Sequence, residues 1–411
     1  MSTTERFREL EASIGREAQR EGKAAWLVGG TVRDRLRRRA PRDLDVAVEG
    51  DAVAFARSWA KRRKAGVDAS GAFGTASVLV RAGKRAMRVD FSSARGETYR
   101  HPGALPDVFP GGIEADLSRR DFTINAMAIP LTGPSAGTLL DPHGGRDDLR
   151  RGLVRMLHAG SPHDDPTRAY RAVRFALRLG FRIAPETRRW IAGARNAGAF
   201  AAVSGDRLRR ELCLLLAEQP PGRAAAALSR EGLDRSIDPD LAVTPAVRAR
   251  LTRLGRIAGR APAAVRCRAS LFAWGLDLPA DSRGKIAVRL GLAGGRKAEL
   301  VRIPDDLAAL RALFASRAPD SEIAALARSW SEEETLAVES ALAPGAAAAL
   351  RRAKRRAARV RLAIGGEDLK RSGLAAGPAI GRALDRTWRA RVDGRIRRAE
   401  ELEYAIREGA R

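Results

Sequence analysis

The strongest constraint on the fold lies in residues 24–48, where a glycine turn precedes two closely spaced carboxylates. The apolar run at 26–28 predicts a short buried strand, Gly29 and Gly30 permit a tight turn, and residues 31–39 have helical periodicity. The turn therefore opens onto the N-terminus of a helix, where free backbone N–H groups attract anions. Such turns are common in α/β domains, so the turn alone is a weak indication of phosphate binding.

The carboxylates that follow make the prediction specific. Asp43 and Asp45 are two residues apart, so on a strand their side chains share a face, with Cα atoms roughly 6.5 to 7 Å apart. Two carboxylates in this arrangement can hold Mg²⁺. On a second predicted strand, Asp90 either completes a two-metal site or is a plain surface residue. Together with Arg33, one helical turn beyond the glycines, the pattern indicates a site for phosphate and metal.

The composition favours a nucleic acid as the partner. The chain has 411 residues and a formal net charge of +27, and 68 of its 76 basic residues are Arg, whose forked donors suit phosphate groups. Self-repulsion of this size is tolerated most easily beside a polyanion. The alternative is that part of the Arg excess is only a compositional habit, because Ala and Arg also crowd ordinary helical stretches such as 346–361.

The two cysteines, Cys213 and Cys267, lie far apart in apolar segments. This excludes a disulfide scaffold and a Cys-based zinc site, and it fits a reducing cytoplasm. No run approaches the roughly 18 apolar residues of a membrane span, and the first twenty residues alternate acidic and basic side chains. We therefore expect a cytoplasmic protein without a membrane partner; its oligomeric state stays open.

Strand and helix signals occupy different parts of the chain. β-like runs lie at 24–28, 44–48, 76–80, 87–91 and 127–131. From Arg146 onward strand signals disappear, and three-and-four spacing of Ala, Leu and Val predicts helices, among them 149–157, 166–179, 185–198 and 206–217. The predicted fold class is α+β: a mixed-sheet head at 1–145, then an all-α neck at 146–218, body at 219–350 and tail at 351–411.

Two further segments of the head carry charge. Residues 95–112, which are punctuated by Pro and Gly, predict a mobile loop at the rim of the site. Beyond them, Arg119, Arg120 and Asp121 precede an apolar run that contains Asn125. Arg120 and Asp121 could meet a triphosphate and a ribose hydroxyl, or they could form internal ion pairs.

Residues 164–175 combine a helix start with a row of arginines. Asp165 before Pro166 is an ordinary helix start, so Asp165 could serve only as a cap. The arginines that follow along one side of the helix are Arg168, Arg171 and Arg174. A sharper hypothesis assigns Asp165 and Arg168 to base recognition, because a carboxylate and a guanidinium complement the amino donor and ring-nitrogen acceptor of adenine and cytosine. Guanine and uracil present the reverse pattern.

These motifs together resemble those of the class II tRNA nucleotidyltransferases, the CCA-adding enzymes, and of the related bacterial poly(A) polymerases in the polymerase-β-like superfamily. Residues 29–34 with Asp43 and Asp45 are similar to the family's first motif, which binds triphosphate and Mg²⁺. Residues 119–127 are similar to its ribose-selecting motif. Residues 164–168 are similar to its amino-acid template for CTP and ATP, with Asp164 where the family usually has Glu. Residues 204–212 resemble the helix that braces this template.

The resemblance implies an enzyme that adds C and A nucleotides to the 3′ end of tRNA from CTP and ATP, with Mg²⁺ as cofactor and pyrophosphate as product. The implied catalytic residues are Asp43, Asp45 and Asp90, of which Asp43 and Asp45 bind the metal. The implied nucleotide-binding residues are Gly29, Gly30, Arg33, Arg120, Asp121, Asn125, Asp165, Arg168, Arg171 and Arg174.

Other activities fit part of the pattern. An enzyme that adds only the terminal A shares nearly all these motifs. Poly(A) synthesis is disfavoured, because residues 71–76 lack the Arg-rich element that poly(A) polymerases carry after the first motif. A non-catalytic RNA-binding protein would not need the carboxylate pair. A nucleotidyltransferase for small molecules would not need the long basic helical region.

Overall fold

The structure is a computed structural model whose described residues are 3–41, 43–70, 74–82 and 85–409. The chain forms two compact units. Unit 1 comprises Met1–Glu211 and Arg230–Ser236, and unit 2 comprises Leu212–Ser229 and Ile237–Arg411. The finer division into head, neck, body and tail stays a prediction.

Unit 1 is built around a six-stranded sheet in the order β3-β4-β5-β2-β1-β8. Strands β2 and β5 are parallel, and the other neighbouring pairs are antiparallel. The strands are β1 (Ala25–Val28), β2 (Leu44–Val48), β3 (Val67–Ser70), β4 (Thr75–Ala82), β5 (Arg85–Ser93) and β8 (Ala128–Pro130). Each of the five predicted β-like runs coincides with one of these strands, and the mixed sheet confirms the α+β class.

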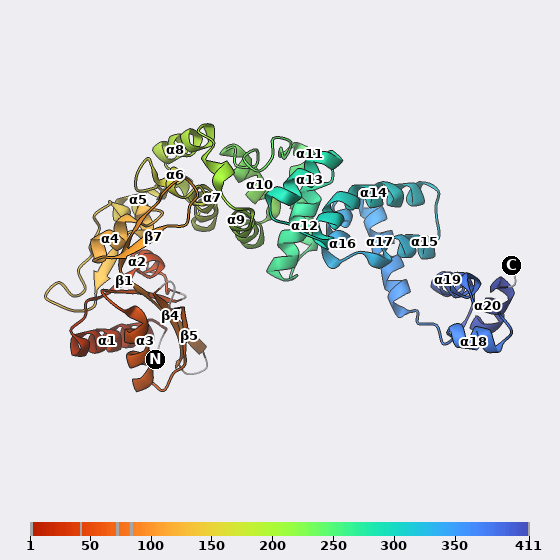
Figure 1. Cartoon of the computed structure of the whole chain (residues 1–411), viewed down its shortest axis with the longest axis horizontal. Coiled ribbons are helices and arrows are strands. Elements are labelled where there is room, and N and C mark those ends of the chain that lie inside the picture. The colour runs from red at the N-terminus through yellow and green to blue at the C-terminus, as the bar shows by residue number, and fades with distance from the viewer. Residues whose placement is uncertain (1–2, 42, 71–73, 83–84, 410–411) are drawn as a thin grey trace. The chain divides into compact units, whose positions relative to one another are not determined.

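Two helices, α1 (Thr3–Glu21) and α3 (Ala52–Arg62), pack beside this sheet (Figure 1). The rings of Phe55 and Trp59 on α3 meet Phe91 of β5 edge-on, with centroids 5.6 and 5.4 Å apart. Phe91 therefore belongs to the buried core. Because successive side chains of a strand point to opposite faces, its neighbour Asp90 lies on the other face of the sheet.

The remaining elements of unit 1 follow the sheet along the chain. They are α2 (Gly29–Leu36), β6 (Arg95–Thr98), β7 (Asp107–Pro110), α4 (Ile113–Ser118), α5 (Gly145–Arg151), β9 (Leu153–Val154), α6 (Ser161–Asp164), α7 (Thr167–Leu179), β10 (Arg182–Ile183), α8 (Pro185–Asn196) and the first part of α9 (Gly205–Glu218). The helices at α7, α8 and α9 confirm the predictions at 166–179, 185–198 and 206–217.

Unit 2, as far as the structure describes it, contains helices and loops but no strand, as predicted. After the end of α9, its helices are α10 (Pro221–Arg230), α11 (Pro245–Ile257), α12 (Ala263–Gly275), α13 (Ala280–Arg289), α14 (Gly295–Ala315), α15 (Asp320–Leu326), α16 (Glu332–Ser340), α17 (Pro344–Arg359), α18 (Gly366–Arg371), α19 (Pro378–Val392) and α20 (Glu401–Gly409). No described helix is long and apolar enough to cross a membrane.

Two predictions of local structure are wrong, and one strand of the sheet was missed. Residues 95–112 contain the antiparallel hairpin of β6 and β7 rather than a loop without regular structure. Residues 149–157 do not form one helix, because α5 ends at Arg151 and β9 then pairs in parallel with β10. Strand β3 was not predicted. Strands β6, β7, β9 and β10 are only two to four residues long, and β7 is exposed throughout, so none of them shows an alternation of apolar and polar residues. The residues of β3 do alternate, but over four positions only, which is too short a run to stand out.

The two cysteines, expected to stay apart, form a disulfide bond. Cys213 on α9 and Cys267 on α12 have Cα atoms 5.0 Å apart. Their separation of 54 residues in sequence concealed this contact, since only the packing of the two helices brings them together. The cysteines therefore no longer argue for a reducing compartment.

Candidate active site

A cavity of about 980 Å³ in unit 1 gathers segments that are far apart in the sequence. All the candidate residues except Arg174 line it: Gly29, Gly30, Arg33, Asp43, Asp45, Asp90, Arg120, Asp121, Asn125, Asp165, Arg168 and Arg171. The glycine turn, the carboxylates and the start of α7 therefore open into one space, large enough for a nucleotide.

The glycine turn lies at the start of α2, directly after β1. Gly29 has a φ of +61°, which side-chain-bearing residues rarely adopt. A Cβ atom added at Gly29 would lie 2.9 Å from Nη1 of Arg120, and one added at Gly30 would lie 3.2 Å from Oδ2 of Asp45. Glycine thus permits a cation and a carboxylate to approach the N-terminus of α2, where free N–H groups can bind phosphate.

The three acidic candidates influence one another electrostatically. Asp45 and Asp90 are register partners on the parallel strands β2 and β5, and Asp43 immediately precedes β2. Burial raises the pKa of the Asp45 carboxyl group; Arg120 opposes this effect, whereas the carboxylates of Asp90 and Asp43 add to it. Additional positive charge beside Asp45 would therefore be favourable.

Sequence analysis missed the cation that stands between two of these acids. Arg88 on β5 places Nη2 3.5 Å from Oδ2 of Asp43 and Nε 3.0 Å from Oδ2 of Asp90. Ser77 on β4 donates a hydrogen bond of 2.5 Å to Oδ1 of Asp90. The spacing of two residues between Arg88 and Asp90 on one strand was a signal that could have revealed the first contact.

The carboxylate oxygens suit a hard divalent cation. Among the described residues, no group of three or more His, Cys, Asp or Glu side chains is already arranged as a metal site. Mg²⁺, however, is usually held by one or two carboxylates together with water and substrate phosphates. Asp43 and Asp45, which lie beside the glycine turn at the N-terminus of α2, fit this mode of binding.

The arginines near the glycine turn are held by neighbouring side chains. Arg33 is 6% exposed and donates from Nη1 to Oδ1 of Asn125 at 2.8 Å. Arg119 and Arg120 both pair with the fully buried Asp116, at 2.5 and 2.7 Å. Burial alone would raise the pKa of Asp116, but Arg120 and Arg119 hold it below its ordinary value. Asp116, which sequence analysis also missed, thus orients both arginines.

Asp121 forms an internal ion pair, one of the two alternatives considered for its segment, and it does so without leaving the cavity, as the other alternative, contact with a ligand, requires. Its Oδ2 lies 2.6 Å from Nη2 of Arg171, and its Oδ1 accepts a hydrogen bond from Asn125 at 3.3 Å. The carboxylate of Asp121 raises the pKa of Arg171. Asp121 and Arg120 therefore form internal ion pairs and still line the cavity.

Asp165 uses one carboxylate oxygen for structure. Its Oδ1 accepts hydrogen bonds from the backbone N–H of Thr167 at 3.0 Å and from its hydroxyl at 2.6 Å, which caps the start of α7. Arg207 on α9 donates to the same oxygen at 2.8 Å. Within the described part of the chain, Oδ2 has no donor, so this oxygen is available to accept a hydrogen bond from a ligand.

The arginines of α7 are positioned by surrounding elements. Arg168 is 4% exposed and donates to Oγ of Ser161 at 2.7 Å and to the backbone oxygen of Arg119 at 2.9 Å. Arg174 lies 3.4 Å from Glu211 on α9, and burial raises the pKa of that carboxyl group. Through Arg207 and Glu211, α9 braces the start and the middle of α7.

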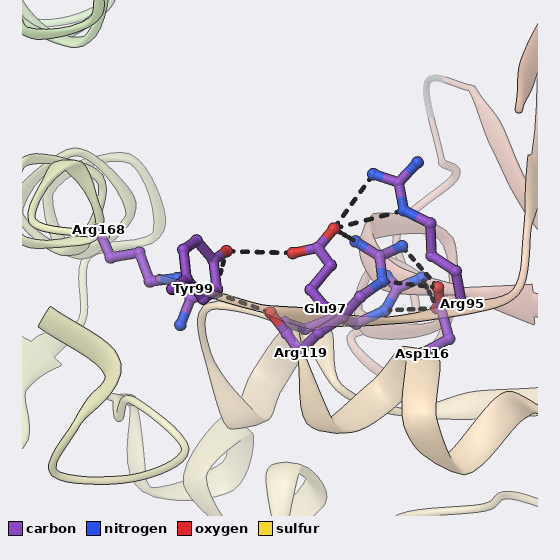
Figure 2. Close-up of polar contacts among 7 residues, drawn as sticks. Arg95, Glu97, Tyr99, Asp116, Arg119 and Arg168 are labelled. Carbon is purple, nitrogen blue, oxygen red and sulfur yellow. Dashed lines mark hydrogen bonds and ion pairs between the residues drawn. The ribbon is translucent and has the colours of Figure 1, made fainter. Parts of the chain in front are cut away.

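Side chains in and just after β6 link Arg168 of α7 to Arg119, as Figure 2 shows. Tyr99, just after β6, donates its hydroxyl hydrogen to Glu97 at 3.1 Å and accepts a hydrogen bond from Arg168 at 3.3 Å. Glu97 in turn accepts one from Arg119 at 2.9 Å. Burial raises the pKa of Tyr99 to about 12, so this hydroxyl stays protonated at neutral pH. Neither Glu97 nor Tyr99 was predicted, because their segment was interpreted as a loop.

Comparisons with known proteins agree with this geometry. The Poly A polymerase head domain family matches residues 25–155. The CC-adding tRNA nucleotidyltransferase of Deinococcus radiodurans is 32% identical, over 93% of this chain and 88% of that protein. The A-adding tRNA nucleotidyltransferase of Geobacter sulfurreducens is 43% identical over 220 residues, which are 54% of this chain but 25% of that protein. A solved structure of a CCA-adding enzyme without ligand is 29% identical, with a TM-score of 0.86 over 97% of this chain and 94% of that one.

Proposed function

Because the chain belongs to the family of class II tRNA nucleotidyltransferases, the CCA-adding enzymes and their relatives, we propose that it adds C and A nucleotides to the 3′ end of tRNA without a nucleic-acid template. CTP and ATP are the substrates. The observation that carries this proposal is that one cavity holds carboxylates for a metal, a glycine turn for a triphosphate, and a carboxylate with a guanidinium for a base.

The proposed reaction is a nucleotidyl transfer. The terminal 3′ hydroxyl of the tRNA loses its proton to solvent, and its oxygen forms a bond to the α-phosphorus of the nucleotide. The bond from that phosphorus to the oxygen that bridges to the β-phosphorus breaks, and pyrophosphate leaves. Mg²⁺, held by Asp43 and Asp45 with Asp90 beside them, would lower the pKa of the attacking hydroxyl and neutralise the leaving group. The N–H groups of the glycine turn and Arg33 bind the phosphates of the incoming nucleotide.

Base selection follows from the donors and acceptors around α7. Oδ2 of Asp165 accepts a hydrogen bond from the amino group of cytosine or adenine, and the guanidinium of Arg168 donates to the adjacent ring nitrogen. Arg120 and Asp121 contact the ribose, while Arg171 and Arg174 support α7. Uracil and guanine present a carbonyl oxygen at the position of this amino group. Two acceptors then face each other, so the carboxylate of Asp165 is left without a hydrogen-bond donor.

A second candidate is addition of the terminal A alone. The 43% identity to an A-adding enzyme, concentrated in about half of this chain, favours it. The sequence argument against poly(A) synthesis rests on residues 71–76, of which 71–73 lie outside the described residues.

Two tRNA primers distinguish these candidates: one ending before the first C and one ending after the second C. With CTP and ATP present, we expect the purified protein to extend the first primer by three nucleotides and the second by one. Extension of the second primer alone would identify an A-adding enzyme. Failure to extend either primer would contradict the proposed function. Product length on a sequencing gel is the measurement.

The Tyr99 hydroxyl provides a test of how Arg168 is held. We expect Tyr99→Phe to lower kcat/KM for both nucleotides about 10-fold, since a hydrogen bond to a charged group is worth roughly 1.5 kcal/mol or more. An unchanged kcat/KM in Tyr99→Phe would show that Ser161 and the Arg119 carbonyl suffice to hold Arg168.

The remaining partners follow from this function. We propose that the basic helices of unit 2, the predicted body and tail, bind tRNA through its backbone and shape. A cytoplasmic location is proposed for the same reason, since the substrate is tRNA.

A further inference from the structure

Phe175 on α7 lies where three arginines of the site converge. The guanidinium carbons of Arg178, Arg174 and Arg33 are 4.4, 5.6 and 5.8 Å from the centroid of its ring. The ring is 8% exposed and lines the cavity. All three distances fall within the range in which an aromatic ring attracts a cation, an attraction that grows when the pair is shielded from water.

The orientation of this ring is itself constrained. Phe122 meets Phe175 with centroids 5.4 Å apart and planes inclined at 63°, which is the favourable edge-on arrangement. Phe122 is fully buried and immediately follows Asp121, the partner of Arg171. The ring of Phe175 is therefore held between its own helix and a segment of the head.

Arg33 is the one arginine of the three that comes from another element, α2. Its other contacts are to Asp34, at 2.9 Å, and to Asn125, at 2.8 Å, both of which hold its edge. The contact with Phe175 places its guanidinium carbon over the aromatic ring, 5.8 Å from the centroid. Because α7 also carries Arg168 near its start, this contact fixes the separation between the phosphate-binding arginine and the base-selecting arginine.

We propose that Phe175 is a positioning residue that aligns Arg33 with the triphosphate and ties the phosphate end of the site to the base-selecting helix. This inference rests on the proposed function of the cavity. The aromatic face is the essential property: leucine would fill most of the same space but offers no π-electrons to a guanidinium, whereas tyrosine keeps both.

The test compares Phe175→Leu with Phe175→Tyr. We expect Phe175→Leu to raise KM for both CTP and ATP about 10-fold and to weaken the binding of inorganic tripolyphosphate by a similar factor, with kcat changed less than about 3-fold. Phe175→Tyr should restore both values to within about 2-fold of the original protein. A purely structural role would lower stability without a selective loss of tripolyphosphate affinity.

Phe200→Leu is the matched control. Phe200 packs edge-on against Tyr170, with centroids 6.1 Å apart, and does not line the cavity. It should lose thermal stability comparably while tripolyphosphate affinity stays the same. Should Phe175→Leu fail to fold by circular dichroism, Phe175→Met takes its place with the same expectation.

A double-mutant cycle with Arg33→Gln decides whether the effect runs through Arg33. If it does, Phe175→Leu changes tripolyphosphate affinity less than 2-fold in the Arg33→Gln background. Independent, multiplying effects would overturn the inference, as would unchanged tripolyphosphate affinity in Phe175→Leu.

Tripolyphosphate binding needs no tRNA, so it separates this inference from the proposed function. If the protein extends tRNA normally and Phe175→Leu leaves tripolyphosphate affinity unchanged, only the inference is contradicted. A protein that extends no tRNA, yet binds tripolyphosphate in a Phe175-dependent way, contradicts only the function.

Discussion

Asp45→Asn should abolish incorporation of CMP and AMP into tRNA, with kcat lowered by about 10³-fold or more. Asparagine has the shape of aspartate but lacks the charge that would hold a metal beside the incoming triphosphate. Asp45 is the most informative of the three acids, because its electrostatic neighbours include Asp43, Asp90 and Arg120. Incorporation of labelled CMP and AMP into a tRNA primer is the measurement.

The same substitution should leave the fold intact or stabilise it. Burial raises the pKa of Asp45, which means that the ionised carboxylate is less favourable in the folded chain than in the unfolded chain. At neutral pH a neutral amide removes this cost, so the midpoint of thermal unfolding should be unchanged or higher. A residue that costs stability yet is needed for activity is typical of a functional site.

Asp68→Asn is the matched control for this experiment. Asp68 is an exposed carboxylate on β3 of the same sheet and does not line the cavity. Its substitution should leave incorporation within about 2-fold. If Asp45→Asn still transfers nucleotides at the rate of the control, the metal mechanism proposed above is wrong.

Asp165→Asn should reduce the preference for CTP and ATP over UTP and GTP by about 10²-fold. The donors Thr167 and Arg207 hold Oδ1, so the amide oxygen should take that position and keep the cap of α7. The amide nitrogen then replaces Oδ2 and turns an acceptor into a donor. A donor at this position can form a hydrogen bond to the carbonyl oxygen of uracil or guanine, whereas the carboxylate, which only accepts hydrogen bonds, cannot.

The measurement is kcat/KM for each of the four nucleoside triphosphates on one tRNA primer. Asp206→Asn serves as control, since Asp206 is an exposed acid at the start of α9 that pairs only with Arg209 among the described residues. We expect it to leave the ratios unchanged. If Asp165→Asn also leaves them unchanged, Asp165 is only a helix cap and base selection lies elsewhere.

The parts of the fold that could be predicted were those with a repeating burial pattern. Strands β1 and β8 are buried along most of their length and therefore appear in the sequence as short apolar runs. Helix α7 buries one side, so its apolar residues recur with the period of a helix. The hairpin of β6 and β7 lacks such a pattern, because β7 is exposed along its whole length and β6 is occupied by charged side chains. For the same reason Glu97 and Tyr99 escaped notice.

The sequence by itself determined the chemical groups of the site: the glycines that admit close neighbours, the carboxylate pair Asp43 and Asp45, and the arginines of α7. These are local features, since a turn, a strand and a helix each place their own residues within a few positions of one another. The tertiary structure alone decided which groups meet. Asp116 with two arginines, Tyr99 with Arg168 and Phe175 with Arg33 are contacts between separate elements, and only the packing of those elements brings them within reach.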